Sequence, residues 1–164
     1  MRGEAKLRPG RFYGLVVRDR RVGGLRFNET EYAPGTQIPR HAHERAYLCL
    51  VRRGEYVERF GRRGRECGPQ TVAFHPPGEE HDERIRETEV RSFNVEFEAD
   101  WLERVGVSPA RLAAGEASPG GPATWGACAL YRDVLAGAAD LDLEARTAAL
   151  ARALGGEHDA PARR

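Results

Sequence analysis

The sequence contains no long apolar run and carries almost no net charge. No segment approaches the roughly 18 consecutive apolar residues that cross a membrane, and the first six residues lead into no apolar stretch. The 26 lysines and arginines stand against 25 acidic residues, so a net charge of +1 creates no field that attracts nucleic acid or anionic lipid. These absences predict a cytoplasmic protein without a membrane segment or a bulk affinity for DNA.

Cysteine is scarce, and common enzyme motifs are missing. The three cysteines, Cys49, Cys67 and Cys128, are odd in number and form no CxxC pair, which argues against a disulfide framework and a zinc knuckle. Cys49 alternates with Tyr47 and Val51 and is expected to be a small buried side chain rather than a nucleophile. No glycine-rich phosphate loop, dinucleotide-binding motif or Ser-His-Asp set is found.

Short strand-like segments separated by glycine and proline turns fill the first hundred residues. A flexible N-terminus is expected over residues 1–10, and a charged turn over 18–24. Strands are expected at 11–17, 25–32, 46–51, 56–60, 71–74, 83–87 and 91–97. In the last of these, Phe93, Val95 and Phe97 alternate with polar residues and share one face. So many short strands at hairpin spacing, with no helix among them, predict an antiparallel sandwich or barrel over residues 11–101.

The composition becomes helical after Trp101. Ser108 and Pro109 begin a short helix, and two longer helices are expected at 123–136 and about 143–154. The first long helix carries an apolar stripe, as does the second. The stripes consist of Ala127, Leu130, Tyr131 and Val134 or Leu135, and of Leu143, Leu150 and Leu154. Residues 102–155 should therefore form a helical segment with an antiparallel pair that packs on the barrel or on a second copy, followed by a disordered tail at 156–164.

Three histidines could share one site. His41 and His43 lie two residues apart, so on a strand both side chains point to the same face, and His81 could supply a third imidazole. Such a shell suits a divalent transition metal, and histidines that line a pocket and form hydrogen bonds are the alternative. His75 precedes a proline, which favours extended backbone and a structural role.

Acidic and aromatic residues add further candidates. Glu58 alternates with Tyr56 and Phe60, so it is either a polar group between two aromatic rings in a pocket or an exposed residue. The charged run 79–83 around His81 is expected to be a solvated loop. The candidate ligand-binding residues are thus His41, His43, Tyr47, Tyr56, Glu58 and His81.

Two segments resemble the sequence motifs of the cupin family. The segment from Gly35 to His43 resembles the first motif, a glycine, five residues and His-x-His, and Pro76-Pro-Gly-Glu-Glu-His81 resembles the second. The family pattern has glutamate four residues after the second histidine, where this chain has Tyr47. Gln70 and Ile85 also replace the second motif's opening glycine and closing asparagine. The resemblance implies a double-stranded β-helix barrel in which metal is possible but one expected ligand is absent.

The segment from His41 to Trp101 and the helix pair are similar, more narrowly, to the N-terminal domain of AraC-type transcriptional regulators. That resemblance implies a small-molecule effector, a homodimer formed through the helices, and no cofactor beyond a possible divalent transition metal. The DNA-binding region of such regulators comes after this domain, so direct DNA binding by this chain alone is not expected. A small metal-dependent cupin enzyme, an isomerase or dioxygenase using His41, His43 and His81, is the alternative. A regulator remnant that dimerises with full-length relatives is a third possibility.

Overall fold

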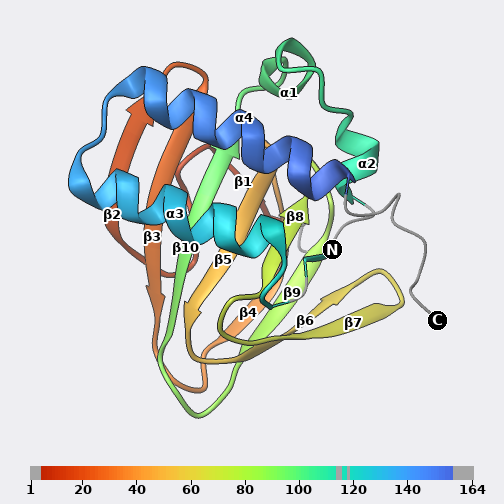
Figure 1. Ribbon diagram of the computed structural model, residues 1–164. Coiled ribbons are helices and arrows are strands. Elements are labelled where there is room, and N and C mark those ends of the chain that lie inside the picture. Colours follow the sequence, from red (N-terminus) through yellow and green to blue (C-terminus); the bar gives the residue numbers. More distant parts are fainter. Residues whose placement is uncertain (1–4, 114–115, 118, 157–164) are drawn as a thin grey trace, which may run out of the picture.

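The computed structural model describes residues 5–113, 116–117 and 119–156, and its strands form two β-sheets packed face to face (Figure 1). The first sheet has the order β1 (Ala5–Leu7), β4 (Gln37–His43), β9 (His81–Ile85), β6 (Tyr56–Phe60) and β7 (Arg63–Cys67). The second has the order β11 (Glu116–Ala117), β8 (Val72–His75), β5 (Tyr47–Arg53), β10 (Val90–Phe97), β3 (Leu25–Tyr32) and β2 (Leu15–Val22). The mainly β, cupin-like sandwich with C-terminal helices confirms the expected fold class.

The six-stranded sheet has one apolar and one largely polar face, and both are buried. On β10, Phe93, Val95 and Phe97 belong to the main apolar core together with side chains of the helices. The intervening Ser92 and Asn94 point toward the other sheet and line a small cavity there. The main core therefore lies between the sheet and the helices. The space between the two sheets holds polar side chains beside a second, smaller apolar cluster made of Ile38, Val51, Tyr56, Cys67, Ile85 and Val90.

The described part of the chain has four helices after β10, and β11 lies between the second and the third. They are α1 (Trp101–Arg104), α2 (Pro109–Ala113), α3 (Pro122–Ala136) and α4 (Asp140–Gly156). Figure 1 shows α3 and α4 lying across the outer face of the six-stranded sheet. The α3 helix ends at Gly137, whose φ of 72° is a left-handed conformation that glycine adopts without strain. The two apolar stripes predicted from the sequence face inward. Their members Ala127, Leu130, Tyr131, Val134, Leu143, Leu150 and Leu154 are all buried, whereas Leu135 is 43% exposed.

The N-terminal segment differs from the sequence-based expectation. Residues 1–10 were expected to be flexible, but Ala5–Leu7 form β1, which pairs in parallel with β4. The expected strand 11–17 and charged turn 18–24 were also wrong, because β2 begins at Leu15 and continues to Val22 through pairing with β3. The strand β2 lies at the edge of its sheet, where charged side chains can remain solvated. In the sequence, the charged residues of this edge strand therefore look like those of a solvent-exposed turn.

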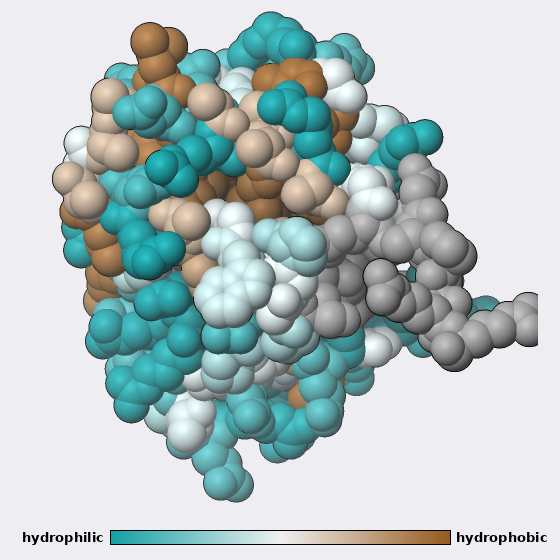
Figure 2. Space-filling view, viewed as in Figure 1, coloured by the Kyte–Doolittle hydropathy of each residue, from teal (hydrophilic) through white to brown (hydrophobic). Residues whose placement is uncertain are grey.

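The C-terminal boundaries agree more closely with the predictions. Gly156, placed in the expected tail, is the last residue of α4, and residues 157–164 lie outside the described part. None of the described helices is both long enough and apolar enough to cross a membrane. The space-filling view shows hydrophobic patches among polar side chains on the helix-covered side (Figure 2). Three large apolar side chains of α3 and α4 are exposed: Trp125, Leu135 and Leu141.

Candidate functional site

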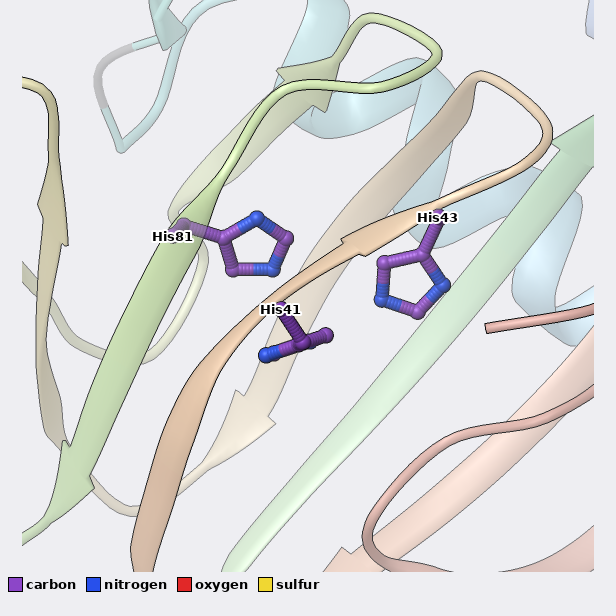
Figure 3. Close-up of side chains that lie close together, drawn as sticks. All are labelled: His41, His43 and His81. Carbon is purple, nitrogen blue, oxygen red and sulfur yellow. The ribbon is translucent and has the colours of Figure 1, made fainter. Parts of the chain in front are cut away.

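The three motif histidines meet between the two sheets. His41 and His81 are directly paired across β4 and β9, and His43 lies two residues further along β4. All three are at most 3% exposed, and one ring nitrogen from each lies within 4.8 Å of the others. Figure 3 shows the three rings gathered beside these strands. The geometric convergence predicted from the His-x-His spacing is therefore present.

Backbone carbonyl groups orient two of these rings. His41 Nδ1 lies 2.9 Å from the Pro39 carbonyl oxygen, and His81 Nδ1 lies 3.1 Å from that of Glu79. Because a carbonyl oxygen can only accept, both Nδ1 atoms must carry the proton. Their Nε2 atoms consequently present lone pairs, as in metal-ligating histidines whose other nitrogen is bound to the backbone.

Burial keeps the three imidazoles neutral. Loss of solvation, followed by the effect of neighbouring histidines, lowers the pKa of His43 to about 2 and that of His81 to about 3. The pKa of His41 is also lowered, mainly by burial. The Nδ1 atom of His43 is buried and has no hydrogen-bond partner among the described residues. At neutral pH the three rings are therefore uncharged, and His43 Nδ1 is a buried polar atom without a partner among the described residues.

Tyr47 occupies the position of the missing glutamate and bonds to the same cluster. Its hydroxyl group lies 3.3 Å from His81 Nε2 and donates to it, because that nitrogen carries no proton. Burial raises the pKa of Tyr47 well above its ordinary value, so the phenol stays neutral. Its ring also stacks on His75, with 4.4 Å between the ring centroids. A neutral donor thus covers the lone pair that His81 would give to a metal.

A buried ion pair extends the cluster. Tyr56 and Glu58 are both buried, which shows that this face of β6 points inward. Glu58 Oε2 accepts a hydrogen bond of 2.5 Å from Arg65 Nε, and its Oε1 lies 3.3 Å from His75 Nδ1. Burial opposes ionisation of Glu58, but His75 and Arg65 hold its pKa below the ordinary value. The interior therefore contains an ionised carboxylate.

The sequence did not indicate how His75 and Arg65 join this cluster. His75 was expected to be structural, yet suitable atoms of Glu58, His75 and His81 lie within 4.8 Å of one another. Arg65 was not singled out at all. The available signal was the turn between β6 and β7, because continuous pairing away from it places Arg65 directly opposite Glu58.

A family model described as the AraC-like ligand binding domain matches residues 29–155, which is most of the chain. The chain belongs to this family. Solved structures similar to this AraC-like domain include a cupin superfamily protein from Desulfitobacterium hafniense, with 16% identity, a TM-score of 0.46 and coverage of 51% of this chain and 75% of that one. No curated protein matches the chain.

Two enzymes are also among the similar structures. The DMSP lyase DddQ of Ruegeria pomeroyi has 22% identity and a TM-score of 0.44, and the match covers 46% of this chain and 39% of the lyase. Oxalate decarboxylase of Bacillus subtilis, described with Mn(II) centres, has 16% identity, a TM-score of 0.43 and coverage of 49% and 23%. At such identities and TM-scores, these likenesses carry no conclusion about the function of the AraC-like domain.

Two aromatic residues before β2 cover the histidines of this AraC-like domain. The Phe12 ring lies 5.0 Å from the His43 ring and 5.6 Å from that of Tyr47, and the Tyr13 ring lies 4.9 Å from that of His41. Both residues had been assigned to a strand. Both residues lie in a loop, where side chains do not alternate between two faces as they do on a strand. Their contacts with the histidines depend on the tertiary fold and could not be predicted from the sequence pattern.

Next to this cluster the AraC-like domain contains a small cavity with an acidic wall. The run 79–83 was expected to be a solvated loop, but His81 and Glu83 belong to β9, and Glu83 lines this cavity of about 20 Å³. The other lining residues are Phe12, Tyr32, Tyr47, Cys49, Tyr56, Ile85, Val90, Ser92 and Asn94. Burial, and then the nearby Glu58, raises the pKa of Glu83 to about 8.

Proposed function

We propose that this AraC-like domain senses a small-molecule effector that binds between the two sheets, around His41, His43, Tyr47, Tyr56, Glu58 and His81. The main support is that this interior is both buried and polar. Burying polar groups without partners costs free energy, and His43 Nδ1 has no partner among the described residues. A ligand that forms a hydrogen bond with His43 Nδ1 would remove this cost.

Access to the interior is proposed to depend on Phe12. The cavity of about 20 Å³ has room for roughly one water molecule, so a larger effector must displace a side chain. Phe12 is only partly buried, lies outside the regular strands and contacts both His43 and Tyr47. Movement of its ring would open the histidine cluster without breaking a strand.

The helix pair is proposed to form the dimer through its outer face. Trp125 is 65% exposed and Leu141 is 79% exposed, and both lie on the two long helices that cover the six-stranded sheet. A second copy of the chain could bury these side chains in a symmetric contact. Effector binding would then act through the dimer, as in a cytoplasmic transcription regulator. This chain alone would not contact DNA directly.

A ligand screen with matched variants tests the sensing proposal. Compounds that raise the melting temperature of the purified protein should bind at least about tenfold more weakly to His43→Ala, since about 1.4 kcal/mol is typical of one lost buried hydrogen bond. The control Arg132→Ala changes an exposed helix residue and should leave affinity unchanged. Ligands that bind both variants equally well would place the effector elsewhere and contradict the proposal.

A metal-dependent enzyme is the second candidate, and the orientation of two histidines supports it. His41 and His81 direct Nε2 inward while Nδ1 binds a backbone carbonyl, so His41, His43 and His81 could hold a divalent ion. Such an ion would supply Lewis acidity to a substrate oxygen. The donor set fits a three-histidine site only if the Tyr47 hydroxyl moves away from His81 Nε2.

Elemental analysis distinguishes these candidates. Near-stoichiometric transition metal in the purified protein, lost in His81→Ala but kept in the exposed control Arg132→Ala, would favour the enzyme. Protein that contains no metal and takes up none from solutions of Zn²⁺, Ni²⁺, Fe²⁺ or Mn²⁺ would count against it.

A further inference from the structure

Three charged residues form a row across the interior face of the five-stranded sheet. Glu58 on β6 is the direct partner of Arg65 on β7 and of Glu83 on β9. Side chains of directly opposed residues lie close together, and like charges in such positions repel each other. The row therefore holds two carboxyl groups and one guanidinium group.

Arg65 is already engaged by one of the two acids. Its Nε donates to Glu58 at 2.5 Å, and one of its terminal nitrogens lies 3.4 Å from His75 Nε2. Across the described residues, no basic side chain forms an ion pair or hydrogen bond with Glu83. The row consequently has one more carboxyl group than it has basic groups, and the extra carboxyl group is that of Glu83.

The surroundings of Glu83 suit a cation of limited size. Tyr32, Tyr47, Tyr56 and Phe12 line the same cavity, and aromatic rings attract cations through their negatively charged faces. The volume of about 20 Å³ is close to that of one water molecule, which an ammonium group resembles in size. An anionic group placed there would face both carboxyl groups of the row.

We propose that the cavity beside Glu83 binds the ammonium group of a small primary amine. This inference rests on the proposed sensing function and names the chemical class of the effector. As the ammonium group enters, the Glu83 carboxyl group releases its proton to solvent, and the nitrogen bonds to the resulting carboxylate inside the aromatic wall. The carbon chain leaves the cavity beneath Phe12. The neutral histidines next to Tyr47 can then accept hydrogen bonds from further donors on the ligand.

A nuclear magnetic resonance titration of the ¹⁵N-labelled, metal-free protein tests this proposal. The probes are propylammonium chloride, its neutral isostere 1-propanol, and potassium chloride at the same concentrations. Propylammonium should shift the amide signals of Tyr56 and Glu83 saturably, and the two other probes should not. Saturable binding of 1-propanol with equal affinity would overturn the proposal. Equal saturation by potassium would identify a bare monovalent cation instead of an amine.

Two variants and a control assign the binding to Glu83. Glu83→Gln keeps the shape of the side chain and should weaken propylammonium binding by about tenfold or more, because a charge-assisted hydrogen bond is lost. Tyr32→Leu removes one aromatic ring from the cavity wall and should weaken propylammonium binding by about threefold. It provides the test if Glu83→Gln does not fold. Glu87→Gln removes an exposed carboxylate shortly after β9 and should leave propylammonium affinity unchanged.

The outcomes also separate this inference from the sensing function. Unchanged affinity in Glu83→Gln, or in Tyr32→Leu, would overturn the amine assignment. Absence of any saturable shift with propylammonium would do the same. If neutral compounds still bind in a manner that depends on His43, the sensing function stands while the amine assignment fails. If they do not, both fail.

Discussion

At the scale of single residues, we expect Tyr47 to limit metal binding at the histidine cluster. Replacing it with glutamate removes the hydroxyl group that donates to His81 Nε2 and adds a carboxylate near His43, whose ring lies 4.6 Å from that of Tyr47. We expect Tyr47→Glu to bind Co²⁺ at least about tenfold more tightly than wild type, because a charged ligand replaces a neutral donor. Isothermal titration calorimetry and the visible absorption of bound Co²⁺ measure this change.

Tyr47→Phe is the matched control for the added carboxylate. It removes the same hydroxyl group but supplies no ligand, so its Co²⁺ affinity should rise less than that of Tyr47→Glu. Equal affinities in the two variants would show that uncovering His81 Nε2, and not the new carboxylate, decides metal binding. A Tyr47→Glu protein that binds no better than wild type would mean that the three histidines do not act together as ligands.

Local spacing predicted the histidines but not their partners. The two-residue separation of His41 and His43 sets their common face on any strand, so this part of the site could be found from sequence alone. His75 and Arg65 reach the cluster from β8 and β7, and their proximity depends on the pairing of strands. For Glu58, alternation left an inward and an exposed orientation equally open, and only the packing of the second sheet decides between them.

At the scale of the helices, Leu150 and Leu141 on α4 should have different roles. The sequence left open whether the stripe with Leu150 packs on the barrel or on a second copy. Leu150 is 3% exposed within a single chain, which places it in the core of that chain. We expect Leu150→Ala to lower the free energy of unfolding by about 2–5 kcal/mol without changing association of the folded protein. Leu141, at 79% exposed, should behave in the opposite way. Leu141→Glu should weaken dimerisation and leave unfolding nearly unchanged.

Urea denaturation and sedimentation velocity at several protein concentrations measure these two effects. A wild-type protein that remains monomeric at all concentrations would contradict the proposed dimer. A Leu141→Glu protein that dimerises as well as wild type would move the interface away from this face of α4. The exposed control Arg132→Ala lies on α3 and should change stability little.

The helices were easier to predict than the first strands, for a physical reason. Each long helix buries a stripe with a 3.6-residue period, so the inward residues of α3 and α4 are visible in the sequence. The strand β2 has one neighbour, and its burial pattern shows little alternation. Phe12 lies outside the strands altogether, and its contacts with His43 and Tyr47 come from the folded chain.

At the scale of the whole molecule, we expect the titratable groups buried between the two sheets to determine much of the response to acid. The main apolar core lies between the six-stranded sheet and the helices, and the titratable groups lie between the sheets. Neutral His43 and His81 have pKa values of about 2 and 3, far below the value of about 6.5 in an unfolded chain. As pH falls below 6.5, the unfolded chain takes up protons that these folded histidines do not, so stability is lost.

Glu83 acts in the opposite direction. Its folded pKa of about 8 lies above the value of about 4.3 in an unfolded chain, so the folded state binds a proton that the unfolded state lacks between these limits. Stability from this group therefore increases as pH falls from about 8 toward 4.3 and is lost as pH rises through about 8. On acidification, the stability gained from Glu83 partly offsets the stability lost from the two histidines.

The last prediction compares variants of the metal-free protein at pH 7 and pH 5. When the pH falls from 7 to 5, each of the two histidines should lower the free energy of unfolding by about 2 kcal/mol, and Glu83 should raise it by about 2 kcal/mol. Glu83→Gln should therefore lose about 2 kcal/mol more than wild type on acidification, and His43→Leu about 2 kcal/mol less. Urea denaturation at the two pH values, with Glu87→Gln as the exposed control, measures the difference. If Glu83→Gln loses no more stability than wild type, then Glu83 is already ionised in the folded protein at pH 7.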